Sequence, residues 1–246
     1  MQLSVVIPVR NEAESILPLL AEIHAALEGR ADFEVVYVDD GSTDATPARL
    51  AEAMAKFPRL RVLRHAQSCG QSAALLTGFR AARGEWIATL DGDGQNDPAD
   101  IPKLLAVRDG SGGGAAAPAN LQLVAGYRRK RQDTWLKRLS SRVANGVRSR
   151  LLGDATPDTG CGLKLILRQA VLELPAFDHM HRFLPALVQR NGGATVSVEV
   201  NHRPRTRGTS NYGMFDRLWV GIVDLFGVMW LQRRWRRPRV TERPRG

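Results

Sequence analysis

Short runs of apolar residues alternate with longer segments of helical pattern over the first hundred residues. Three of the short runs are rich in valine and isoleucine, lack polar alternation, and span 3–9, 33–40 and 86–91. Such runs are typical of strands covered on both faces. The segments between them repeat their apolar residues at helical spacing and span 12–28, 46–57 and 72–82. Pro47 suits the first turn of the second segment. This alternation predicts βαβ units, hence an α/β fold with a mostly parallel sheet flanked by helices.

The remainder of the chain predicts a mixture of elements. Strands are expected at 121–128 and 194–204, and helices at 135–152, which is basic and amphipathic, and around 180–190. Two segments read as loops instead. Residues 108–120 are of low complexity and predict a flexible insertion, and 205–213 form a basic, glycine-containing loop.

The last apolar run, 218–231, contains Asp224 and has 14 residues. A bilayer-spanning helix needs about 20 apolar residues, so this run is too short to span. Tryptophans and arginines flank it, namely Trp219, Trp230, Trp235, Arg217, Arg233, Arg234, Arg236 and Arg237. That arrangement favours an amphipathic helix on a membrane surface over a core helix with a solvated basic tail. The predicted organisation is a catalytic domain at 1–212 and a surface helix with its basic tail at 213–246.

Charge is unevenly distributed along the 246 residues. The net charge is +10, and the final 14 residues contribute +6 through seven arginines and one glutamate. Such a tail suits anionic lipid, nucleic acid or no partner at all. The two cysteines have neither metal nor redox spacing, which favours a reducing compartment. The first residues show no basic start and no cleavage site, so no signal peptide is expected.

The stretch WIATLDGDGQNDP places two aspartates, Asp91 and Asp93, directly after an expected strand. Two carboxylates so close repel each other unless a cation lies beside them. Mg²⁺ and Mn²⁺ prefer such oxygen ligands, and Gln95 offers another. The alternative is a plain acidic turn in which Asp97 caps the next helix.

Two further strand ends are polar, in IPVRNEAESI (7–16) and VDDGSTDA (38–45). Because ligands of open α/β sheets bind beyond the carboxyl ends of the strands, the three ends together predict a pocket for a polyhydroxylated, phosphorylated ligand. Neither a Gly-x-x-x-x-Gly-Lys nor a Gly-x-Gly-x-x-Gly motif occurs at these turns. A P-loop nucleotidase and an NAD enzyme are therefore disfavoured.

Four stretches, SVVIPVRNE, VDDGSTD, GQSAALLTGFRAARGEWIATLDGDGQNDP and HRPRTRGTSNY, occur in an order and spacing that resemble family 2 glycosyltransferases of the GT-A fold. The resemblance covers about residues 3–215. More narrowly, the chain resembles the polyprenyl-phosphate glycosyltransferase branch and is similar to dolichyl-phosphate mannose synthase. The motif LDGDGQNDP and the late R-x-x-G-x-S loop carry this narrower resemblance. The sequence departs from the pattern at Gly94, where leucine is common, and at Asn211, where lysine is common.

The resemblance implies roles for individual residues. Asp91, Asp93 and Gln95 would hold Mg²⁺ or Mn²⁺ against the donor diphosphate, and Arg128 and Arg138 would join the two aspartates in catalysis near the acceptor phosphate or the sugar. The implied donor-binding residues are Pro8, Arg10, Glu12, Asp39, Asp40, Gly41, Ser42, Gly70, Arg203, Arg207 and Ser210. Of these, Pro8, Glu12, Asp39 and Asp40 would line the nucleoside pocket, and Arg203, Arg207 and Ser210 would close over the donor phosphates.

The expected reaction is inverting, metal-dependent transfer of a sugar from a UDP- or GDP-linked donor to a polyprenyl phosphate such as undecaprenyl phosphate, which supplies a lipid-linked sugar to the cell envelope. A lipid phosphate is already an anion and needs no general base. A hydroxyl acceptor of a polysaccharide or glycolipid would need one, and Asp133 and Asp158 are the candidates. A degenerate, non-catalytic domain is disfavoured by the intact set of Asp91, Asp93 and Gln95.

The resemblance also implies partners and a location. The protein would act as a peripheral protein at the cytoplasmic face of the inner (plasma) membrane, where a soluble nucleotide sugar meets a lipid phosphate. An integral membrane partner and a homo-oligomer both stay open. A non-catalytic basic binding protein is the alternative from another class. Because the basic residues are not interleaved with stacking aromatics on a recognisable module, no specific nucleic-acid partner is expected.

Overall fold

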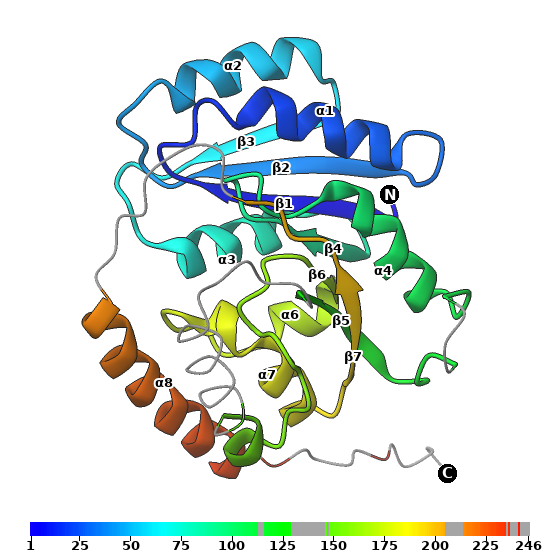
Figure 1. Ribbon diagram of the computed structural model, residues 1–246, viewed down its shortest axis with the longest axis vertical. Coiled ribbons are helices and arrows are strands. Elements are labelled where there is room, and N and C mark those ends of the chain that lie inside the picture. The colour runs from blue at the N-terminus through cyan, green and yellow to red at the C-terminus, as the bar shows by residue number, and fades with distance from the viewer. Residues whose placement is uncertain are drawn as a thin grey trace, which may run out of the picture.

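The computed structural model describes residues 1–112, 116–128, 146, 148–204, 214–234, 236 and 241, with side chains in the last long helix described from 220 onward. One sheet lies between two layers of helices (Figure 1). Three predicted site residues, Arg138, Arg207 and Ser210, lie outside the described residues, as do most of the helix expected at 135–152 and the loop expected at 205–213.

The sheet has seven strands in the order β3-β2-β1-β4-β6-β5-β7. Their bounds are β1 Leu3–Val9, β2 Phe33–Asp39, β3 Leu60–Arg64, β4 Trp86–Thr89, β5 Leu121–Arg128, β6 Lys164–Leu167 and β7 Ala194–Val200. Strand β6 pairs antiparallel with both of its neighbours, β4 and β5, and the other pairings are parallel. The mostly parallel sheet that the sequence predicts is therefore confirmed, with one reversed strand inside it.

Helices cover both faces of the sheet. They are α1 Ile16–Leu27, α2 Thr46–Lys56, α3 Gln71–Ala81, α4 Ile101–Arg108, α6 Arg168–Leu172, α7 Leu184–Arg190 and α8 Met214–Arg234, with short 3-10 helices η1 Pro98–Asp100 and η2 Met180–Arg182. In Figure 1, α1 and α2 lie above the sheet and α3, α6 and α7 lie below it. Helices α1, α2 and α4 contribute to one buried apolar cluster, and α3, α6, α7 and α8 contribute to the other.

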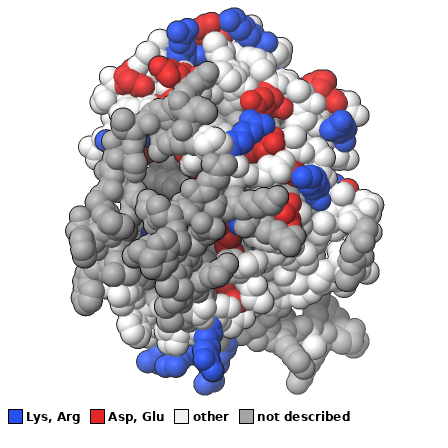
Figure 2. All heavy atoms as spheres, viewed as in Figure 1, with Lys and Arg blue, Asp and Glu red and all other residues white. Residues whose placement is uncertain are grey.

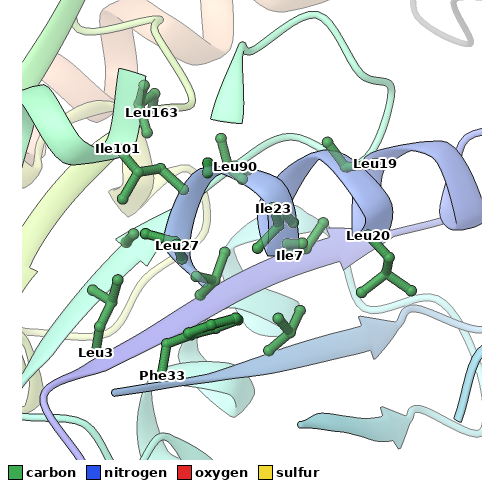
Figure 3. Close-up of a cluster of buried hydrophobic side chains, with 14 of the residues drawn as sticks. Leu3, Ile7, Leu19, Leu20, Ile23, Leu27, Phe33, Leu90, Ile101 and Leu163 are labelled. Atoms are coloured by element: carbon green, nitrogen blue, oxygen red, sulfur yellow. The ribbon is translucent and has the colours of Figure 1, made fainter. Parts of the chain in front are cut away.

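The core explains why the central strands lack alternation. All seven residues of β1 and all seven of β2 are buried, because each strand faces a helical layer on both sides. Figure 3 shows α1 laying Leu20, Ile23 and Leu27 onto β1 and β2, with Leu90 and Leu163 closing the same cluster beside the end of β4. The strand end that carries the aspartates is thus fixed by apolar packing directly beneath it.

Some element boundaries in the structure differ from those that the sequence predicts. The helix expected from residue 12 begins at Ile16, because 11–15 form a turn at the strand end in which Asn11 has a left-handed φ of 57°. The strand expected at 194–204 ends at Val200. Strands β3 and β6 and helices α4 and α6 escaped prediction, since each is short or carries charged residues within its apolar pattern.

Helix α8 packs one side against the domain and leaves another side uncovered. Val228 is buried, and Leu225, Met229 and Leu231 pack against the second apolar cluster. Four large apolar side chains point away from it and are exposed, namely Ile222, Val223, Phe226 and Trp230. Within the described part of the chain, every helix is too short or too polar to cross a bilayer.

Candidate active site

The carboxyl ends of β1, β2 and β4 meet at one edge of the sheet, as the sequence predicts for a parallel arrangement. The turns after β1 and β2 are joined by side chains. The Asn11 N–H donates to Ser42 Oγ (3.0 Å), and the Thr43 N–H donates to Asn11 Oδ1 (2.9 Å). The Glu12 N–H donates to Thr46 Oγ1 at 2.9 Å. Two of the three predicted strand ends therefore form a single hydrogen-bonded unit.

Asp39 and Asp40 end β2 but lie in different surroundings. Asp39 is fully buried; its Oδ1 accepts from the Ser42 N–H at 2.9 Å, and its Oδ2 lies 3.3 Å from Arg64 Nε. Pro8 is buried in β1, whereas Arg10 is exposed at the rim. The predicted nucleoside-pocket residues from β1 and β2 are thus brought together.

The Asp40 carboxylate is surrounded by donors from the segment 65–70. The backbone N–H groups of Cys69 and Gly70 donate at 2.8 and 2.9 Å, and Ser68 Oγ donates at 2.7 Å. His65 Nδ1 lies 2.7 Å from Oδ1. Burial on its own would raise the pKa of Asp40, but these hydrogen bonds outweigh it and hold the pKa below its usual value. Asp40 is an ionised anchor for the segment that precedes α3.

Gly41 is needed where the turn after β2 meets that segment. It has a φ of +64°, and a Cβ at this position would lie 2.6 Å from the backbone of Gln67 and Ser68. A side chain would therefore both strain the backbone and push the two segments apart. Among the predicted donor-binding residues, Gly41 acts by allowing close approach.

The second acidic group lies in residues 91–97, which we call the metal loop after the metal ligands that the sequence predicts there. Gln71 Nε2 donates to Asp91 Oδ1 at 2.9 Å, and the Asp91 N–H donates to Asn96 Oδ1 at 2.9 Å. The Gln95 N–H donates to Asp93 Oδ1 at 3.1 Å. Asn96 is buried, so the loop is folded back on its own start. Asp91 and Asp93 face the same small region.

Electrostatics distinguish Asp91 from Asp40. Burial and then the charge of Asp93 raise the pKa of Asp91, while the cations Lys164 and Arg128 oppose that shift. A carboxylate whose ionised form is destabilised by a neighbouring carboxylate suits a divalent cation, because the cation's charge removes the repulsion and its oxygen preference matches the ligands. Asp91 and Asp93 therefore fit Mg²⁺ or Mn²⁺, and Gln95 follows in the same loop.

Arg128 ends β5 and is held by Asp158 in a two-pronged ion pair. Arg128 Nε donates to Asp158 Oδ2 at 2.6 Å, and Nη2 donates to Oδ1 at 3.0 Å. Both side chains are largely buried, with 13% and 8% exposed. Arg128 thus supplies fixed positive charge near Asp91, and Asp158 is committed to an arginine.

The segment 161–164 closes the site on the side of β6. Lys164 is buried beside Asp91 and donates to the backbone oxygen of Cys161, and burial lowers the pKa of its ammonium. Thr89 Oγ1 donates to the Gly162 backbone oxygen at 2.6 Å. Cys161 is fully buried, and burial raises the pKa of its thiol, so it packs as a small apolar residue.

Three members of this site were missed in the sequence, namely Gln71, Asn96 and Lys164. Gln71 follows Gly70 at the start of α3, so one dipeptide contacts both aspartate sites. Lys164 carried a usable signal, since it is a lone charge inside an apolar run. Predicted Arg203 lies at the site's edge, where its guanidinium contacts Glu22 and Asp97.

A second group of metal-type ligands occurs within the described ranges, formed by Asp40, His65 and Cys69. Its carboxylate already accepts from two backbone amides, a hydroxyl and an imidazole. A cation there would have to displace those donors. The arrangement is that of a hydrogen-bonded anchor, and the metal candidate remains the pair of Asp91 and Asp93.

The chain belongs to glycosyltransferase family 2, whose family model, described as glycosyl transferase family 2, matches residues 4–174. Dodecaprenyl-phosphate galacturonate synthase of Rhizobium johnstonii is 35% identical over 246 residues, covering 97% of this chain and 69% of that protein. Undecaprenyl-phosphate 4-deoxy-4-formamido-L-arabinose transferase of Edwardsiella ictaluri is 36% identical over 217 residues, covering 86% and 63%. The chain therefore spans about two thirds of the length of these relatives.

Solved structures share the fold. Glucosyl-3-phosphoglycerate synthase from Mycobacterium tuberculosis, in complex with Mn²⁺, UDP-glucose and glycerol 3-phosphate, aligns with a TM-score of 0.64 and 22% identity over 94% of this chain and 79% of that one. A mannosyltransferase from Pyrobaculum calidifontis, in complex with GDP-mannose and Mn²⁺, aligns with a TM-score of 0.66 and 21% identity over 96% and 66%. The predictions of family 2 and of a GT-A fold are confirmed.

Proposed function

We propose that this chain transfers a sugar from a UDP- or GDP-linked donor to a polyprenyl phosphate, with inversion and with Mg²⁺ or Mn²⁺ bound at Asp91, Asp93 and Gln95. Two relatives are named for dodecaprenyl and undecaprenyl phosphates, which supports the acceptor class. Two fold neighbours are complexes with Mn²⁺ and a nucleotide sugar, which supports the donor and the cation. The lipid-linked product would serve the cell envelope.

The observation that carries the choice of acceptor is the ion pair of Asp158. A hydroxyl acceptor requires a carboxylate that can take a proton. Asp158 was one of two sequence candidates, and both of its oxygens are occupied by Arg128. The other candidate, Asp133, lies outside the described residues. A phosphate acceptor is already deprotonated, so it needs no such group.

The chemistry is a single displacement. An oxygen of the acceptor phosphate attacks the anomeric carbon of the sugar and forms the new bond, while the bond from that carbon to the donor diphosphate breaks. The nucleoside diphosphate departs with the electron pair. A divalent cation, when bound, supplies positive charge to that leaving group. Arg128 adds fixed positive charge near Asp91, and we assign Asp39 to the donor nucleoside.

We propose that α8 holds the protein on the membrane surface that carries the acceptor. Its uncovered side presents Ile222, Val223, Phe226 and Trp230. Arg233, Arg234 and Arg236 follow and are exposed, and Figure 2 shows basic side chains gathered at the end of the molecule where α8 ends in Figure 1. Apolar side chains beside arginines suit an anionic bilayer surface. We place this surface at the cytoplasmic face of the plasma membrane, where the protein would be peripheral.

The membrane proposal is tested by vesicle flotation with and without anionic lipid. Phe226→Glu is expected to weaken binding roughly tenfold, since it buries a charge in place of an aromatic ring. Met54→Glu is the matched control, because Met54 is an exposed apolar residue on α2. Equal loss in both variants, or no binding of the unaltered protein to anionic vesicles, would contradict the proposal.

The transferase proposal is tested with purified protein, undecaprenyl phosphate and Mg²⁺ or Mn²⁺, screening UDP- and GDP-sugars for nucleotide release and lipid-extractable sugar. A chelator and Asp93→Asn serve as controls. Lipid-linked, metal-dependent product is the expected result and names the sugar. Donor hydrolysis without lipid product would move the acceptor to the hydroxyl class. If the protein neither turns over any donor nor binds one in calorimetry, the proposed function is contradicted.

A further inference from the structure

Arg203 lies immediately after β7, in the segment 201–204 that runs beside the metal loop. Its Nη1 lies 2.6 Å from Glu22 Oε2 on α1, and its Nη2 lies 2.7 Å from Asp97 Oδ1 at the end of the loop. We call these two contacts the Arg203 bridge. The three side chains are 40%, 43% and 14% exposed, respectively, so the bridge reaches from solvent into the loop.

The same segment also contacts the metal loop through its backbone. The Arg203 N–H donates to the Gln95 backbone oxygen at 3.0 Å, and Asn96 pairs with His202 as an antiparallel bridge. The Asn201 N–H donates to Asp100 Oδ2 at 2.5 Å. Residues 95–100 are therefore held along their length by 201–203.

Two acids occupy the guanidinium of Arg203. The sequence resemblance places this arginine over the donor phosphates, but in the structure its Nη atoms contact Glu22 and Asp97 instead. Both Nη atoms already contact a carboxylate, and the two acids hold the guanidinium against α1 and the end of the loop. We infer that Arg203 is a positioning residue, which fixes Gln95 and the end of the metal loop against α1 and so sets the affinity for the cation.

This inference rests on the proposed function, because it assigns a role at the same metal site. The magnitude is bounded by the exposure of the pair. Partly exposed ion pairs contribute little to stability, so global stability should change little. The effect should appear in the loop and in the cation dependence: the concentration of Mn²⁺ that gives half-maximal rate should rise roughly three- to tenfold, while the rate at saturating Mn²⁺ stays within about twofold.

The experiment compares Arg203→Gln with Arg59→Gln. Arg59 is a matched control, since it is 39% exposed and lies near two carboxylates, those of Glu28 and Asp32, at the far end of β3. Hydrogen exchange of backbone amides 91–97, measured without metal, should speed up in Arg203→Gln alone. Mn²⁺ binding in the presence of UDP, followed by electron paramagnetic resonance, should weaken in that variant alone. Arg203→Lys should restore part of the effect, because an ammonium can pair with one of the two acids.

A mutant cycle distinguishes positioning of the loop by Arg203 from direct contact with phosphate. The cycle adds Arg203→Gln to a variant that already carries Glu22→Gln and Asp97→Asn. If Arg203 acts through these two acids, the addition should cause little further loss. Fully additive losses, with unchanged amide exchange in 91–97, would overturn the inference and favour direct contact with phosphate. Should the unaltered protein show no metal-dependent turnover, the proposed function fails, while the amide exchange still decides whether the bridge orders the loop.

Discussion

Two acidic strand ends lie at the same edge of the sheet, one on each side of β1, and their surroundings differ in opposite directions. The Asp40 carboxylate, after β2, accepts from two backbone amides, Ser68 and the His65 ring, and its pKa is lowered. The Asp91 carboxylate, after β4, accepts from Gln71 and faces Asp93, and its pKa is raised. The difference teaches that acidity at a strand end has two uses. The Asp40 carboxylate is satisfied by donors of the protein, whereas the Asp91 carboxylate is the one we propose as a cation ligand.

The largest break in this comparison should come from Asp93→Asn. Removing one charge of the pair should lower turnover by ~100-fold or more, because the cation and the leaving diphosphate lose a fixed ligand. The apo melting temperature should stay level or rise, since a like-charge repulsion is relieved. Turnover and calorimetric melting measure the two effects. Mn²⁺ with UDP should raise the melting temperature of the unaltered protein but not that of the variant. A variant that is less stable than the unaltered protein without metal would show that Asp93 has a structural role instead.

Asp40→Asn should lower stability, whereas Asp93→Asn should lower turnover. The amide nitrogen of the substituted side chain would face hydrogen-bond donors, so the free energy of unfolding should fall by about 3 kcal/mol. Urea unfolding measures this. Because the folded pKa of Asp40 is lowered, its ionised form contributes stability above the unfolded pKa of about 3.9, and that contribution is lost as pH falls through the folded value. The difference between protein and variant should therefore shrink below about pH 4. A difference that grows as the pH falls below about 4 would refute the anchor.

Gln71→Leu tests the Asp91 site again, because it removes the side-chain donor to Asp91. We expect turnover at limiting Mn²⁺ to fall up to about tenfold, because one hydrogen bond to a charged group orients that ligand. Gln169→Leu is the matched control, as Gln169 on α6 donates to an exposed glutamate just beyond the end of that helix. Equal rates for both variants across a Mn²⁺ titration would show that Gln71 does not orient Asp91.

Ser68→Ala should have the smallest effect. It removes one of four donors to Asp40, and the remaining three keep the carboxylate satisfied. The free energy of unfolding should fall by about 1 kcal/mol. Ser111→Ala, which removes an exposed hydroxyl from the end of α4, should be nearly silent in the same urea experiment. A loss as large as that of Asp40→Asn would mean that the donors act as one unit.

The sequence predicts local features well and distant pairings poorly. The strands at 3–9 and 33–39 and the aspartates at their shared edge followed from apolar runs and polar strand ends. Asp158 could not be assigned to Arg128, because 30 residues separate them and neither lies in a repeating pattern. The pairing of Arg203 with Glu22 spans 181 residues and depends on where the segment after β7 approaches α1. Propensity fixes elements, while the partner of a charge is a property of the assembled fold.

The reversed strand β6 has a consequence for how the protein is made. It separates β4 from β5 in the sheet, yet it follows β4 by about 75 residues in the chain. At roughly 5–20 residues per second, a growing chain would carry β4 as an open sheet edge for on the order of 4–15 s. Open edges invite pairing with other chains. The proposed cation site is therefore completed late in synthesis, and a chain released before residue 167 would hold both aspartates beside an unpaired strand.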